Sequence, residues 1–272
     1  MPTTFDDPPQ GLLGPDDPPP FEVVNLDGTA PLLLVCDHAS RTVPAGLDNL
    51  GLPDDRLAEH IGWDIGAAAV TRALAERLNA PAVLCGYSRL VIDCNRLPGD
   101  PTSIPPVSDA TAVPGNQDLT EVEQQARTDA VFWPYHRAIG DALAHLWRRL
   151  PGVAPALISL HSFTPCMRSG APRPWHAGLL WNRDPRLVVP LLSALRTAEP
   201  GLVVGDNEPY DGRTVNYTLD LHAGAAGLPH VAVEIRQDLI ADDAGAAAWS
   251  DRLAAVLDPL LGDPHIHRVQ HY

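Results

Sequence analysis

The chain contains no lysine, so all 19 of its basic residues are arginines. This absence excludes enzymes that depend on a lysine Schiff base, a pyridoxal phosphate anchor or the lysine of a phosphate-binding loop. Positive charge is scarce overall, because 34 acidic residues bring the net charge to −15 and the pI to about 4.9. A chain of this charge repels a phosphate backbone, so we expect no nucleic-acid partner.

Cysteines and long apolar runs are also scarce. The four cysteines form no C-x-x-C pair, and two of them lie inside apolar runs, which is typical of reduced core residues in a cytoplasmic protein. The sequence has no apolar run of about 18 residues, and its N-terminus has no basic region followed by an apolar stretch. We therefore expect a cytoplasmic protein without a membrane span.

The 272 residues are expected to form a flexible arm over 1–20, one domain over 21–262 and a C-terminal tail over 263–272. The first 20 residues hold seven prolines and four aspartates. Such a segment buries too little apolar surface to offset its ordering entropy, so it is predicted to remain loose.

The domain alternates short apolar runs with segments of helical periodicity, which favours an α/β fold with a mostly parallel or mixed central sheet flanked by helices. Helices are predicted at 64–78, at 120–150 with a kink or break at Pro134, at 185–196 and at 242–261. The proline-rich stretch 97–117 is predicted to be a long ordered loop able to cover a site. Strands are predicted at 32–36, 82–85, 90–94, 156–160, 178–181, 202–204 and 230–235.

Four of the apolar runs are followed directly by polar clusters. In open α/β sheets, ligands bind beyond the carboxyl ends of the strands, so these clusters are candidate site residues. One such cluster alone would more often be satisfied by neighbouring backbone groups, but four together indicate a site. The clusters are Asp37 to Arg41, Asp93 to Arg96, His161 to Thr164 and Glu234 to Asp238.

Two of these clusters supply histidines suited to a metal. His38 and His161, together with one carboxylate, form the ligand set of a catalytic zinc ion that keeps a position open for water. Asp64 is the expected third ligand, with Asp37 and His60 as alternatives. We expect one zinc ion per chain, and other divalent metals remain possible.

The remaining polar residues suggest roles around that metal. Glu234, a lone carboxylate after an apolar strand, is the expected general base. Asn95 and Arg96 combine an amide with a rigid guanidinium and are expected to hold a substrate carboxylate. Arginines in or near the clusters are candidates to polarise the reacting carbonyl, and turn residues nearby are candidate substrate contacts. The candidates to polarise the carbonyl are Arg41 and Arg89. The candidate substrate contacts are Ser40, Ser162, Arg168, Asn207 and Tyr210.

The sequence resembles the N-formylglutamate amidohydrolase family in segments spread over nearly all of the domain. They are LLLVCDHASRTVP, EHIGWDIGA, SRLVIDCNR, ISLHSF, GDNEPYDG and VAVEIRQDLI. The resemblance implies a fold similar to that of zinc-dependent carboxypeptidases and hydrolysis of N-formyl-L-glutamate to formate and glutamate, as in histidine degradation. It implies zinc-ligand roles for His38 and His161 and a base role for Glu234. The carboxypeptidase-like H-x-x-E pair is absent, because Arg41 stands three residues after His38.

Other functions are compatible with the same residues. The site could serve a zinc peptidase or an N-acyl amino acid deacylase with a different substrate. A protein that binds small anions on this scaffold without chemistry is a further alternative. A cysteine hydrolase using Cys36 is weaker, because a thiol in an apolar strand is usually buried and inert. In the enzymatic cases the partner is a small N-acyl substrate, and the sequence does not define the oligomeric state.

Overall fold

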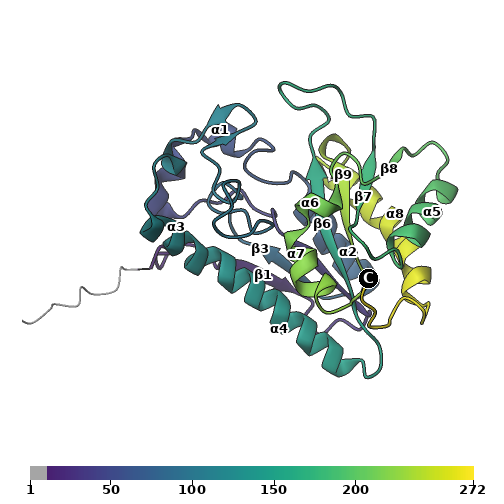
Figure 1. The fold of residues 1–272 in the computed structure, drawn as a ribbon. Coiled ribbons are helices and arrows are strands. Elements are labelled where there is room, and N and C mark those ends of the chain that lie inside the picture. Colours follow the sequence, from purple (N-terminus) through teal and green to yellow (C-terminus); the bar gives the residue numbers. More distant parts are fainter. Residues whose placement is uncertain (1–10) are drawn as a thin grey trace, which may run out of the picture.

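The structure of the protein is a computed structural model, which describes residues 11–272. A seven-stranded sheet forms its centre (Figure 1). The four central strands, β3, β2, β6 and β9, run parallel, whereas β1, β7 and β8 run antiparallel to them. This mixed, mostly parallel sheet confirms the predicted α/β fold. In sheet order, the strands are β1 (Phe21–Val24), β3 (Ala82–Cys85), β2 (Leu32–Cys36), β6 (Ala156–Phe163), β9 (His230–Arg236), β7 (Ala177–Leu180) and β8 (Val204–Asp206).

Helices cover both faces of the sheet, and alternate strand residues supply two separate apolar cores. In β2, Leu32 and Leu34 face the core shared with α2 (Ala67–Leu78), α5 (Val188–Ala198) and α8 (Asp243–Leu261). Leu33 and Val35 face the core covered by α4 (Trp133–Arg149). Because every residue of β2 is buried, the strand reads as a continuous apolar run. Short elements complete the fold: α1 (Asp54–Leu57), β4 (Val107–Ser108), β5 (Thr111–Ala112), α3 (Glu121–Arg127), α6 (Gly212–Val215) and α7 (Tyr217–Leu219).

The prediction of a strand at 90–94 is wrong. This segment is a series of turns in which the Val91 N–H donates to the carbonyl of Ser88, and the Ser88 hydroxyl accepts from the Leu90 N–H. Its apolar residues are nevertheless buried. A short run of apolar residues is typical of a buried strand, but a buried series of turns produces the same run. The edge strand β1 was not predicted, because its four residues are partly exposed and form no apolar run.

The predicted helix at 120–150 is three consecutive helical segments. A capping box between Thr120 and Glu123 opens α3, as the sequence indicates. A π-helical segment, Thr128–Phe132, then leads into α4. Pro134 lies in the first turn of α4. Proline is tolerated there because the N–H groups of a first helical turn do not need a partner within the helix.

Both ends of the described chain contact the domain. Residues 1–10 of the expected flexible arm lie outside the described residues. In the rest of that arm, Asp17 accepts a hydrogen bond from the Ala45 N–H, and the carbonyl of Pro18 accepts one from the Tyr87 hydroxyl. In the tail, both ring nitrogens of the buried His267 lie within hydrogen-bonding distance of backbone carbonyls. Within residues 11–272, no helix is both long and apolar enough to cross a membrane.

Candidate metal centre and active site

The carboxyl ends of three parallel strands bring the predicted site residues together. His38 lies two residues beyond the end of β2, and His161 of β6 is paired in register with Glu234 of β9. Asp64 precedes α2, and its backbone N–H donates to the carbonyl of His38 at 3.0 Å. Together with residues from surrounding loops they line a cavity of about 190 Å³.

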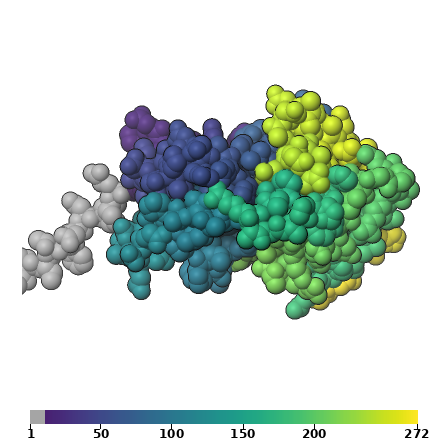
Figure 2. Space-filling model, turned by 90° about the horizontal axis from the view of Figure 1, so that it is seen from above, coloured from purple at the N-terminus to yellow at the C-terminus, as the bar shows by residue number. Residues whose placement is uncertain are grey.

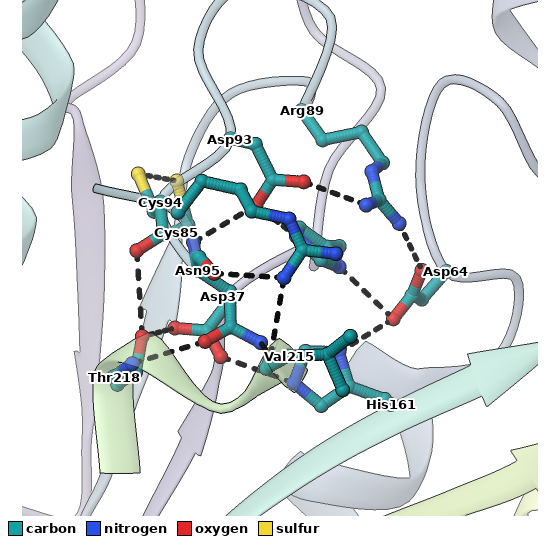
Figure 3. Close-up of polar contacts among 12 residues, drawn as sticks. Asp37, Asp64, Cys85, Arg89, Asp93, Cys94, Asn95, His161, Val215 and Thr218 are labelled. Carbon is teal, nitrogen blue, oxygen red and sulfur yellow. Dashed lines mark hydrogen bonds and ion pairs between the residues drawn. The ribbon is translucent and has the colours of Figure 1, made fainter. Parts of the chain in front are cut away.

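His38, Asp64 and His161 form a compact and fully buried group. Figure 3 shows Asp64 and His161 side by side. The Nδ1 atoms of His38 and His161 lie 3.2 and 2.8 Å from Oδ2 of Asp64. One ligand atom from each of the three residues therefore lies within 4.8 Å of the other two. Two imidazoles and a carboxylate are a ligand set that zinc and related divalent metals accept, so these residues fit a metal ion.

A carboxylate holds each imidazole from behind. Nε2 of His38 lies 2.8 Å from Asp93 Oδ1, and Nε2 of His161 lies 3.1 Å from Asp37 Oδ2. Such pairs are typical of metal-binding histidines, because they fix the tautomer and aim the other nitrogen at the ion. Asp37 is therefore placed behind a ligand rather than among the ligands, which favours Asp64 as the third ligand.

Asp37 is the most enclosed acid of the site. Its Oδ1 accepts hydrogen bonds from the Tyr135 and Thr218 hydroxyls at 3.0 and 2.7 Å, and its Oδ2 accepts one from Ser159 at 2.9 Å. Burial alone would raise its pKa, but the hydrogen bond and charge of His161 hold the pKa well below the ordinary value. Burial would conversely lower the pKa of His161, but Asp37 and Asp64 raise it well above normal.

Glu234 has the properties of a general base. It is 7% exposed and lines the cavity, and its Oε2 has no hydrogen-bond partner in the described part of the chain. Burial raises its pKa to about 7, and the charge of Asp64 adds to this effect. A carboxylate with such a pKa can accept and return a proton near neutral pH. Gly178 of β7 is its register partner, and a Cβ there would collide with the carbonyl oxygen of Glu208.

The two arginines that line the cavity differ in their partners. Arg89 donates to Asp93 Oδ2 at 2.6 Å and lies 3.7 Å from Asp64 Oδ1. Arg96 contacts two backbone carbonyls, at 3.3 Å each, and no carboxylate among the described residues. Arg96 is thus the arginine that can pair with an anionic ligand.

Asn95 borders the cavity, but its amide is occupied by the chain itself. Its Nδ2 donates to the carbonyl of Val215, and its Oδ1 accepts from the Thr218 N–H. Asn95 therefore links the polar cluster Asp93 to Arg96 with the segment 215–218, in which the Thr218 hydroxyl donates to Asp37. These contacts position the side chain, but the NH2 group has a second hydrogen and Asn95 lines the cavity, so its contact with a substrate carboxylate stays a prediction.

The other predicted site residues divide into two groups. Ser162 and Tyr210 line the cavity, whereas Ser40, Arg41, Arg168 and Asn207 do not. Ser40 bonds to Thr42, Arg41 is exposed, the Arg168 side chain pairs with Glu59, and the Asn207 amide oxygen caps two backbone N–H groups. Ser40, Arg168 and Asn207 are thus satisfied by other protein groups, which a sequence pattern cannot distinguish from ligand contacts.

Three loops form the outer wall of the cavity. The sequence pointed to His60 and to the loop 97–117, but not to Asp109 or Met167. His60 comes from the α1–α2 connection, Asp109 from the β4–β5 turn and Met167 from the loop after β6. Asp109 joins these loops, because its Oδ2 lies 3.0 Å from His60 Nε2 and its carboxylate accepts from the Arg168 N–H. Figure 2 shows the teal-green loop after β6 lying against the blue N-terminal part of the chain. The long loop 97–117 thus borders the cavity through Ser108 and Asp109.

Comparison with known proteins shows the family of this chain. The profile of the N-formylglutamate amidohydrolase (FGase) family matches residues 30–241. The gene product Atu2144 from Agrobacterium tumefaciens is 38% identical, with a TM-score of 0.87 over 92% of this chain and 98% of that one. The chain therefore belongs to the N-formylglutamate amidohydrolase family.

A second solved structure extends the comparison of folds. N-formylglutamate amidohydrolase from Ralstonia eutropha JMP134 is 23% identical, with a TM-score of 0.67 over 90% of this chain and 98% of that one. At this identity the likeness shows a shared fold. No curated protein sequence matches this chain.

Proposed function

We propose that the protein is a metal-dependent amidohydrolase that cleaves the N-formyl, or a related N-acyl, amide of an amino acid. The reaction that the family name indicates is N-formyl-L-glutamate plus water to formate plus L-glutamate. The observation that carries the proposal is the position of Glu234, a buried carboxylate whose Oε2 has no hydrogen-bond partner among residues 11–272 and which lines the same cavity as the His38–Asp64–His161 group. We propose one zinc ion as the cofactor, held by these three residues.

The side chains of the cavity have separate tasks in this proposal. His38, Asp64 and His161 would hold a divalent metal, which would supply polarisation of the amide carbonyl and a lower pKa for water. Glu234 accepts the proton that the attacking water loses, and it delivers that proton to the departing nitrogen. Arg96 binds the substrate carboxylate and orients the amide. Arg89, anchored by Asp93, places positive charge beside the reacting group.

Two measurements on the purified full-length chain test the proposal. Metal content after purification without chelator should be close to one ion per chain, and formate release from N-formyl-L-glutamate should depend on that ion. N-acetyl amino acids and dipeptides, assayed in parallel, separate deformylation from deacylation and peptidase activity. Bound metal without hydrolysis of any N-acyl substrate would overturn the proposal in favour of a binding protein. Absence of tight metal after reconstitution with zinc would also overturn it.

A further inference from the structure

Arg173 lies behind the wall of the cavity, beside two aromatic rings. Its guanidinium carbon is 4.9 Å from the centroid of the Tyr210 ring and 5.8 Å from that of the Phe163 ring. Both aromatic residues line the cavity, whereas Arg173 does not. Among residues 11–272 the guanidinium bonds to the Thr164 carbonyl and the Tyr210 hydroxyl rather than to a carboxylate. Aromatic faces and neutral oxygens therefore stabilise this charge in place of an acidic partner.

The hydrogen bond between Arg173 and Tyr210 leaves the phenol proton without an acceptor. Nη1 of Arg173 donates to the Tyr210 hydroxyl oxygen at 3.0 Å. A guanidinium has donors only, so it occupies a lone pair of the phenol oxygen and cannot accept the phenol proton. The Tyr210 hydroxyl donates to no other group in the described part of the chain. A hydrogen-bond donor of a cavity residue is thus left for a ligand.

The surroundings of Tyr210 keep this donor protonated and strengthen it. Burial raises the pKa of Tyr210, and the charge of Glu234 adds to this effect. The phenol therefore carries its proton near neutral pH. The cation of Arg173 polarises the O–H bond, which makes the hydroxyl a stronger donor. The loop that carries the arginine is held in place, since the Arg173 N–H donates to the Pro165 carbonyl at 2.8 Å.

Building on the amide hydrolysis proposed above, we infer that Arg173 is a positioning residue of the active site. It holds the Tyr210 hydroxyl so that the O–H donates to an oxygen of the bound N-acyl amino acid. Arg173 acts only through the phenol, because it neither lines the cavity nor belongs to the metal group. Its role differs from that of Arg96, which lines the cavity and pairs with the substrate directly.

A double-mutant cycle on the metal-loaded, full-length chain tests whether the two residues act as a unit. The kcat/KM for N-formyl-L-glutamate should fall by about 10–100-fold in Tyr210→Phe, because a hydrogen bond to the substrate is lost. Arg173→Met should lose about tenfold, because the hydroxyl is then free to turn away. The double variant should lose no more than Tyr210→Phe alone. Losses that multiply in the double variant, or an unchanged kcat/KM in either single variant, would overturn the inference.

Further variants separate this role from a purely structural one. Arg252→Met is the matched control, because Arg252 also stacks on an aromatic ring, 4.5 Å from the Trp249 centroid, and does not line the cavity. A loss in Arg252→Met equal to that in Arg173→Met would overturn the inference. Arg173→Lys keeps a cation and a donor, and it replaces Arg173→Met in the cycle if the latter does not fold. Failure of the unmodified chain to hydrolyse any N-acyl compound would instead overturn the proposed function.

Discussion

The inner and outer walls of the cavity are built in different ways. The inner wall consists of His38, Asp64, His161 and Glu234, which are all buried and lie at or just beyond strand ends or at the start of α2. The outer wall consists of residues on three loops, of which His60 and Met167 are only partly buried. The inner wall holds the metal group and Glu234, whereas the three loops of the outer wall contribute no member of the metal group. The sheet therefore fixes the positions of the groups that the proposed function uses, and contacts between loops fix the rest of the lining.

Removal of a metal ligand should have the largest effect. His161→Ala removes one Nδ1 from the metal group and leaves Asp37 buried without its partner imidazole. Metal content, measured by elemental analysis, should fall to near zero, and formate release should fall to background. His145→Ala, on the outer side of α4 and remote from the cavity, is the control. Full metal content in the His161→Ala protein would remove this histidine from the ligand set.

Substitution of the base should separate chemistry from metal binding. Glu234→Gln keeps the size of the side chain but cannot accept the proton, so kcat should fall by about 10²–10⁴-fold. Metal content should stay unchanged, because Glu234 is not in the ligand group. Asp238→Asn, on the exposed side of the same segment, is the control. Activity near that of the unmodified protein would rule out Glu234 as the base.

The carboxylates behind the imidazoles should have an intermediate effect. Asp37→Asn keeps the shape of the side chain but removes the negative charge that holds His161. Metal affinity, measured by competition with a chelator, should fall by about 10–100-fold. An unchanged affinity would show that the Ser159 hydroxyl, 2.8 Å from Nε2 of His161, suffices to orient the His161 ring.

The stability of the metal-free protein should depend on pH through Glu234. Its pKa is raised from 4.5 to about 7 by burial, so the native state binds this proton more tightly than the unfolded chain does. The resulting stabilisation is full below about pH 4.5 and is lost as the pH rises through about 7. Relative to Glu234→Gln, the unfolding free energy should thus decrease across this range, on the order of 3 kcal/mol. Parallel denaturant titrations of the two proteins that show a constant difference would contradict this.

A change in the outer wall should have the smallest effect. Met167→Ala removes apolar surface from the rim of the cavity and touches no member of the metal group. We expect an increase in KM below about tenfold, with kcat and metal content unchanged. Cys166→Ala, at the exposed neighbouring position, serves as the control. A loss of metal in the Met167→Ala protein would show that the two walls are not independent.

The same division explains what the sequence could predict. His38, His161 and Glu234 follow or end apolar runs, so the topology of a parallel sheet brings them together without knowledge of the loops. The sequence left Asp37 and His60 as alternatives to Asp64, because the approach of Asp64 to both imidazoles depends on the turn before α2. The contact of Asp109 with His60 and Arg168 joins three loops far apart in sequence, and no local pattern encodes it. The contacts of Asn95 with Val215 and Thr218 could not be predicted either, since these partners lie about 120 residues away.

The close approach at Gly178 limits how this protein can change over generations. Any side chain at this position would push the Glu208 carbonyl away and displace the turn that carries Tyr210 to the cavity. The same strand position lies beside Glu234 in the sheet. A substitution of Gly178 by any other residue would therefore disturb Glu234 and one wall of the cavity together, so this position tolerates no side chain.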